Sequence, residues 1–278
     1  MSKHVPLVCV GGLAVHTCDW QQFRRVFERT QPQRPFFVVE RSMFDDCVFE
    51  VIPAYMWEAE LAHLYAHVSK IVSVHGPVQL LGHSMGGLLA EGFARLYPGL
   101  VKHLVLLDTA SPERFPTVKH EHVPFRKEVS CLGTSLFSRA VIHSFPVAVS
   151  ALALARGNSF TQAKNLHNLY STENAVRYFF AELQQEKVWT AQLVEVSKTH
   201  ALQVPCLVLA APGNLSAWLP SQKSWVRAQR ILAENLASET KHVPGVANGE
   251  PRVFKVIERA THMVMLSQPA ALNASTYL

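Results

Sequence analysis

The chain has 278 residues, of which 49% are apolar and 17% are charged. This length and composition fit a globular protein with one large core, and they argue against an intrinsically disordered chain. The formal net charge is +5, but the basic residues are scattered along the chain, so we expect no nucleic-acid partner.

The first part of the chain alternates strand-like and helix-like patterns. An apolar run at residues 6–10 ends at Gly11 and Gly12, and a second run spans residues 36–40. Between residues 57 and 72 the apolar residues recur every three or four positions, which is typical of an amphipathic helix. Apolar strands that alternate with helices predict a parallel sheet covered on both faces.

The third apolar run, residues 78–82, leads into the sequence Gly82-His83-Ser84-Met85-Gly86. A helical pattern follows and stops before Pro98, and a fourth strand-like run spans residues 103–108. The pattern Gly-x-Ser-x-Gly is weak alone, but between a strand and a helix it predicts a sharp turn that lifts the serine hydroxyl above the sheet edge. Glycine is needed on both sides because larger side chains would collide there.

Residues 112 to about 200 interrupt this alternation with mostly helical patterns, which we place at 134–156, 172–187 and 188–199. Their longest apolar run, nine residues, is too short to span a bilayer. Strand-like runs resume at residues 206–211 and 252–258, with an extra helix expected near 217–238.

The chain resembles the α/β-hydrolase family over nearly its whole length. "VGGLAVHTCDW" is similar to the family's oxyanion turn, "GHSMGG" to its nucleophile elbow, and "ATHMVMLSQP" to its histidine loop. Because the first of these features begins close to the N-terminus, we expect the family's usual leading antiparallel strands to be missing. The resemblance implies a six-stranded parallel sheet flanked by helices, formed by residues 1–111 and 201–278, with a helical cap at residues 112–200 after the fourth strand.

The resemblance also assigns roles to individual residues. Ser84 is the expected nucleophile, and His262, after the last predicted strand, is the expected base. The backbone N–H groups of Met85 and Leu13 would bind the oxyanion. His83, inside the elbow, is expected to pack beside the nucleophile.

The third member of the catalytic set is open at this point. Aligning "LVLAAPGN" with the family pattern puts Asn214 where relatives carry an acid. Asp108, which ends the fourth predicted strand, could have taken over that role. Alternatively the enzyme works as a Ser–His dyad with Asn214 orienting the ring, or catalysis has been lost. A glutamate from the later segment, such as Glu234 or Glu239, is a further possibility.

These observations predict a serine hydrolase that cleaves a small to medium acyl ester or thioester, without cofactor or metal. The apolar cap favours an acyl or aromatic substrate over a sugar or nucleotide. A non-catalytic binding or scaffold protein of the same fold, or a carbon–carbon bond hydrolase, stays an alternative. The odd count of five cysteines, without a Cys-x-x-Cys pair, predicts reduced thiols. With no signal peptide or membrane helix in the pattern, we expect a cytoplasmic protein without stable membrane insertion.

Overall fold

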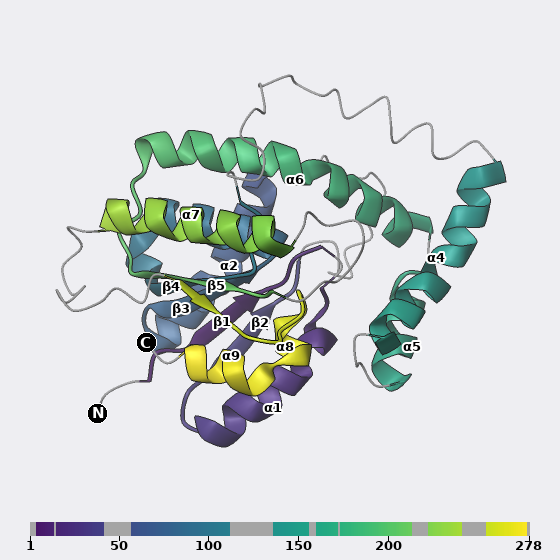
Figure 1. The fold of residues 1–278 in the computed structure, drawn as a ribbon, viewed down its shortest axis with the longest axis horizontal. Helices are drawn as coiled ribbons and strands as arrows, with labels where there is room; N and C mark the ends of the chain where they lie inside the picture. The colour runs from purple at the N-terminus through teal and green to yellow at the C-terminus, as the bar shows by residue number, and fades with distance from the viewer. Residues whose placement is uncertain are drawn as a thin grey trace.

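The computed structural model describes residues 4–13, 15–41, 57–111, 136–155, 160–171, 173–212, 222–240 and 254–276 (Figure 1). The strands are β1 (Leu7–Val10), β2 (Phe36–Val39), β3 (Val78–His83), β4 (Val101–Leu107), β5 (Cys206–Ala210) and β6 (Phe254–Val256). The α-helices are α1 (Gln21–Thr30), α2 (Trp57–His75), α3 (Met85–Leu96), α4 (Leu136–Ala155), α5 (Phe160–Leu169), α6 (Glu173–Thr199), α7 (Gln222–Thr240), α8 (Val264–Ser267) and α9 (Pro269–Ser275). Two 3₁₀ turns, η1 (Thr17–Trp20) and η3 (Pro98–Leu100), complete the described elements.

The six strands form one all-parallel sheet in the order β2-β1-β3-β4-β5-β6, which confirms the predicted fold. The chain crosses from one half of the sheet to the other between β1 and β3, which are direct neighbours. In open α/β sheets, the crevice at the carboxyl ends of strands beside such a switch point is the usual ligand site. The residues that follow β1 and β3 therefore meet at the position where a site is expected.

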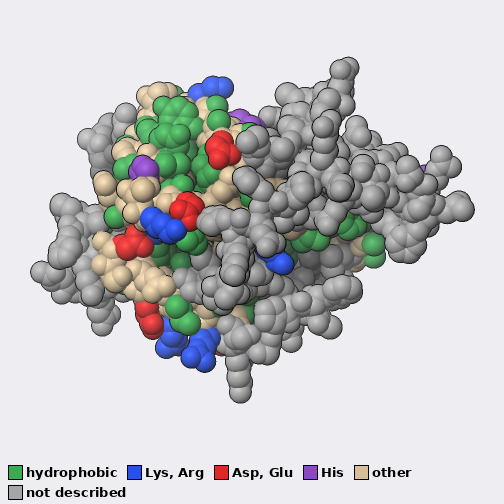
Figure 2. Space-filling model, turned by 90° about the horizontal axis from the view of Figure 1, so that it is seen from above, with side chains coloured by type: hydrophobic (Ala, Val, Ile, Leu, Met, Phe, Trp, Pro, Cys, Tyr) green, Lys and Arg blue, Asp and Glu red, His purple; other side chains and the backbone are tan. Residues whose placement is uncertain are grey.

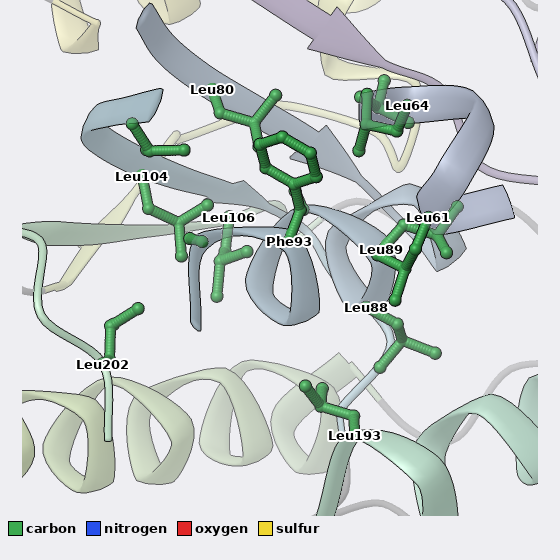
Figure 3. Close-up of a cluster of buried hydrophobic side chains, with 14 of the residues drawn as sticks. Leu61, Leu64, Leu80, Leu88, Leu89, Phe93, Leu104, Leu106, Leu193 and Leu202 are labelled. Carbon is green, nitrogen blue, oxygen red and sulfur yellow. The ribbon is translucent and has the colours of Figure 1, made fainter. Parts of the chain in front are cut away.

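Helices cover both faces of the sheet, as the fully buried pattern of β3 requires. On one face α2, α3, α6 and α7 contribute to a single apolar cluster, and on the other α1, α8 and α9 contribute to a second (Figure 1). Figure 3 shows part of the first cluster, in which Leu88 on α3 and Leu193 on α6 lie close together. Both clusters include side chains of the strands, one cluster on each face of the sheet, so the strands are held by packing from two sides.

The helices between β4 and β5 differ from the prediction in two respects. The two separate patterns at 172–187 and 188–199 are one continuous helix, α6, and α5 is an additional helix before it. The C-terminal half of α6 packs against the core, because Trp189 and Leu193 belong to the first cluster. The N-terminal half contacts α4, which in turn packs against α5. Helices α4 and α5 extend away from the sheet in Figure 1. The division into core and cap at residues 111 and 201 stays a prediction.

A third, smaller apolar cluster joins the helices after β4 to the body of the protein. Ala153, Ala163, Leu166 and Tyr170 from this region pack with Cys18 of η1, the turn that precedes α1. Phe145 and Phe179 are partly buried against the cluster, with ring centroids 4.8 Å apart. An aromatic surface therefore adjoins the loop that follows β1.

Charged side chains on the described part of the surface are mixed in sign. Figure 2 shows lysine and arginine side chains in separate small groups, beside acidic and apolar ones, on the face seen there. Among the described helices, none combines the length and the apolar character required to cross a bilayer.

Candidate functional site

Ser84 occupies the sharp turn between β3 and α3. Its backbone has φ 54° and ψ −126°, a left-handed φ that residues with a side chain rarely adopt. Three donors hold the Ser84 carbonyl oxygen: the Gly87 N–H at 2.9 Å, the Ala110 N–H at 3.1 Å and the Thr109 hydroxyl at 3.1 Å. These three hydrogen bonds hold Ser84 in its strained conformation. Strained residues of this kind occur most often at functional sites.

The turn after β1 lies directly against this elbow. A Cβ at Gly12 would lie only 2.6 Å from Ser84 Cβ and 3.1 Å from Met85 N, and a Cβ at Gly86 would collide with Gly11 O. Only glycine allows the two backbones to come this close. Leu13 follows within the same turn, which the Val15 N–H closes on Gly12 O at 3.2 Å. Met85 is the first residue of α3, so its N–H has no partner within the helix.

Asp108 follows β4 and is 2% exposed. It too has a left-handed backbone, with φ 45°. Its two carboxylate oxygens have different partners. Oδ2 lies 2.6 Å from His262 Nδ1, while Oδ1 accepts hydrogen bonds from Ala211 N at 2.8 Å and from Trp225 Nε1 at 2.7 Å. The carboxylate is therefore fully engaged and held in one orientation.

His262 lies in the loop between β6 and α8 and connects the other two residues. Its Nε2 is 3.0 Å from Ser84 Oγ, opposite the Nδ1 that faces Asp108. The side chain is 19% exposed, so the ring is reachable from solvent. His83 is fully buried, and its Nε2 lies 2.8 Å from His262 O. His83 thus packs beside the elbow, as expected, and also holds the backbone of the histidine loop.

The other candidate acids do not share this position. Glu239 forms an ion pair with Arg95 at 2.7 Å and accepts the Leu202 N–H at 3.1 Å. Arg95 is near the far end of α3, about 15 Å along the helix from the elbow. Glu234 is exposed on α7, and Asn214 lies outside the described residues. No group of three or more potential metal ligands occurs in the part of the chain that the structure describes.

A buried charge cluster beside the site was not anticipated. Arg41, just after β2, is 2% exposed and lies 3.0 Å from Glu60 of α2 and 2.6 Å from Glu182 of α6. Its guanidinium also stacks 4.8 Å from the ring of Trp189. Burial raises the pKa of Glu182 to about 7, with Arg41 lowering it and Glu60 raising it. Because one cation serves two carboxylates, one of them keeps a proton near neutrality.

Comparison with known proteins places the chain in a family. Residues 8–275 match the alpha/beta hydrolase family, and the chain belongs to that family. The crystal structure of Cfl2 from Burkholderia cenocepacia is similar, with a TM-score of 0.69 and 16% identity over 99% of this chain and 87% of that one. The thioesterase domain from the curacin biosynthetic pathway has a TM-score of 0.64 and 17% identity over 98% and 91% of the two chains. At these identities the two structures support the fold alone.

A rat (Rattus norvegicus) protein, named 1-acylglycerol-3-phosphate O-acyltransferase ABHD5, is 28% identical over 145 residues. The match covers 49% of this chain and 38% of the rat protein, so this chain spans well under half of that relative's length.

Proposed function

We propose that this protein is a serine hydrolase that cleaves an acyl ester or thioester through an acyl-enzyme on Ser84. One observation carries the proposal: Ser84 Oγ, His262 and the Asp108 carboxylate form a continuous chain with contacts of 3.0 Å and 2.6 Å. A serine hydroxyl becomes a useful nucleophile only beside such a base, and the base works best when a third group orients it.

In the proposed reaction, Ser84 Oγ attacks the acyl carbon while His262 Nε2 takes the hydroxyl proton. The negative oxygen of the tetrahedral intermediate is stabilised by the N–H groups of Met85 and Leu13. The bond to the leaving alcohol or thiol then breaks, and His262 returns the proton to that group. Water attacks the acyl-enzyme in the same way, giving its proton to His262, and releases the carboxylic acid and free Ser84.

Asp108 supplies the orienting acid in this scheme. Its Oδ2 holds the proton on His262 Nδ1, which leaves Nε2 free to accept the serine proton, and its negative charge stabilises the protonated imidazole. The loss of an acid at Asn214 was the main reason to consider a non-catalytic protein. A carboxylate on the neighbouring strand, in contact with the same ring, favours the hydrolase instead.

The substrate is proposed to carry an apolar acyl chain of small to medium size. Phe145, Phe179 and Tyr170 lie together next to η1, which follows the glycine turn. An apolar surface near the site suits an acyl group better than a sugar.

The test is labelling with a fluorophosphonate and hydrolysis of short-chain p-nitrophenyl esters. The wild type should do both, and Ser84→Ala should lose the label and at least about 10³-fold of the esterase rate. Ser238→Ala, an exposed serine on α7, is the matched control and should behave like the wild type. Labelling that persists in Ser84→Ala, or a wild type without turnover, would reject the proposal.

A second candidate is acyl transfer to an alcohol rather than to water, suggested by the name of the rat relative. The acyl-enzyme is the same, and only the group that resolves it differs. Adding 1-acylglycerol-3-phosphate during ester turnover would decide between them. Transfer predicts the diacyl product and faster release of the leaving group, whereas hydrolysis predicts only free acid.

A further inference from the structure

Helix α7 reaches the proposed acid from the segment between β5 and β6. Trp225 lies in its first turn, is 8% exposed, and donates its indole N–H to Asp108 Oδ1 at 2.7 Å. Tryptophan has a single donor, and here that donor is directed at a buried carboxylate. The contact joins residues 117 positions apart in the sequence, so it depends on the tertiary fold.

The two oxygens of the Asp108 carboxylate have different hydrogen-bond partners. Oδ1 accepts the Trp225 N–H and the Ala211 N–H, whereas Oδ2 faces His262 Nδ1. With two donors on one oxygen, the carboxylate cannot rotate without breaking both bonds.

Two further contacts place α7 against the same point. Gln229, one helical turn after Trp225 and on the same face, donates to Thr109 O at 2.6 Å. The Trp225 ring meets the His262 ring edge-on, with centroids 6.1 Å apart and an interplanar angle of 78°. One face of α7 therefore contacts the strained backbone after β4, the carboxylate and the imidazole.

From this geometry we infer that Trp225 is a positioning residue for the proposed catalytic acid. Its N–H holds the Asp108 carboxylate in one orientation, and through Asp108 it fixes the ring of His262. This inference rests on the proposed function. It assigns to α7 a part in the chemistry, although the helix contributes no group that touches the substrate.

The test compares Trp225→Phe, which keeps an aromatic ring and removes the donor, with Trp57→Phe. Trp57 is buried on α2, and its indole N–H has no hydrogen-bond partner among the described residues, so this change removes an N–H without removing a bond to the acid. Trp225→Phe should lower kcat about 10-fold with little change in KM, because one charge-assisted hydrogen bond is lost. Trp57→Phe should retain the wild-type kcat and KM.

A double-mutant cycle separates this role from simple packing. In an Asp108→Ala background, Trp225→Phe should change kcat by less than about twofold, because the acceptor of the indole N–H has already been removed. The indole N–H resonance that disappears in Trp225→Phe should also shift in Asp108→Asn, a measurement that needs only the folded Asp108 variant.

The outcomes are distinguishable. If the wild type hydrolyses esters but Trp225→Phe keeps its kcat, or if the two losses are additive, the inference is wrong and the hydrolase stands. A wild type with no hydrolysis and no fluorophosphonate label overturns the proposed function, and this inference with it.

Discussion

Asp108 and Ser84 both have left-handed backbone conformations, at the ends of neighbouring strands β4 and β3. Each is held by hydrogen bonds from neighbouring segments, so the strain is offset by contacts of the whole fold. The two strained turns bring a hydroxyl and a carboxylate to opposite nitrogens of one imidazole. At the scale of single residues, the chemistry thus depends on two costly backbone conformations.

Asp108→Asn should reduce kcat far more than Asn214→Ala. An Asp-to-Asn change in serine proteases costs about 10⁴-fold because the amide favours the wrong imidazole tautomer. We expect a loss of about that order at Asp108 and less than about threefold at Asn214, measured as ester turnover at saturating substrate. Equal and small effects would point to a dyad or to an inactive protein.

At the scale of elements, α6 links the other helices between β4 and β5 to the core through charge as well as packing. Its Glu182 meets Arg41, whose Nη1 also lies 3.5 Å from Gly11 O in the glycine turn. A buried charge that loses its partner is costly, so this cluster favours one docked position of α6 beside the turn.

The raised pKa of Glu182, about 7 in the folded protein against an ordinary value near 4.5, predicts a pH-dependent stability. Between these two values the folded state binds the extra proton, so the free energy of unfolding falls as pH rises from about 5 to 8. The change should be roughly 1 to 3 kcal/mol. Urea unfolding of the wild type and of Glu182→Gln at both pH values measures it.

Glu182→Gln should flatten this dependence, because the amide does not titrate. Glu195→Gln, on the exposed side of the same helix, is the matched control and should keep the wild-type slope. If Glu182→Gln and the wild type lose the same stability between pH 5 and 8, another group is responsible.

At the scale of the whole molecule, helices and apolar side chains cover both faces of the parallel sheet. The described cysteines lie on the sheet or on η1 beside it, where this covering limits their contact with solvent. Cys9 on β1 and Cys18 on η1 are buried, and the described cysteines, which include Cys206 on β5, are free thiols. Burial raises the pKa of Cys18 to about 12 and that of the other two well above the ordinary value. The prediction of buried thiols is confirmed for Cys9 and Cys18, whereas Cys206 is partly exposed.

These three thiols should therefore resist an aromatic disulfide reagent in the native protein at pH 8 and react fully in urea. The variant with Cys47→Ser and Cys131→Ser removes the two cysteines outside the described residues. Its reaction rate should match the rate of unfolding measured by fluorescence. Rapid reaction of the native variant would show that the layers around the sheet open readily.

The sequence predicted the six strands and the elbow, because both follow from local patterns. Apolar runs mark the six strands, and Gly82, Ser84 and Gly86 have a recognisable spacing. Arg41 was missed as a buried group, since a charged residue beside a loop usually faces solvent. Asp108 stayed one alternative of several, and Trp225 was not considered, because their contacts join distant segments and no local pattern encodes them.

The most direct test of the central claim is mass spectrometry of the protein quenched in acid during turnover of an activated ester. The account predicts a mass increase equal to the acyl group, located on the peptide that contains Ser84. The adduct should be absent from Ser84→Ala and should form more slowly in Asp108→Asn. An adduct on another residue, or turnover without any adduct that involves Ser84, would contradict it.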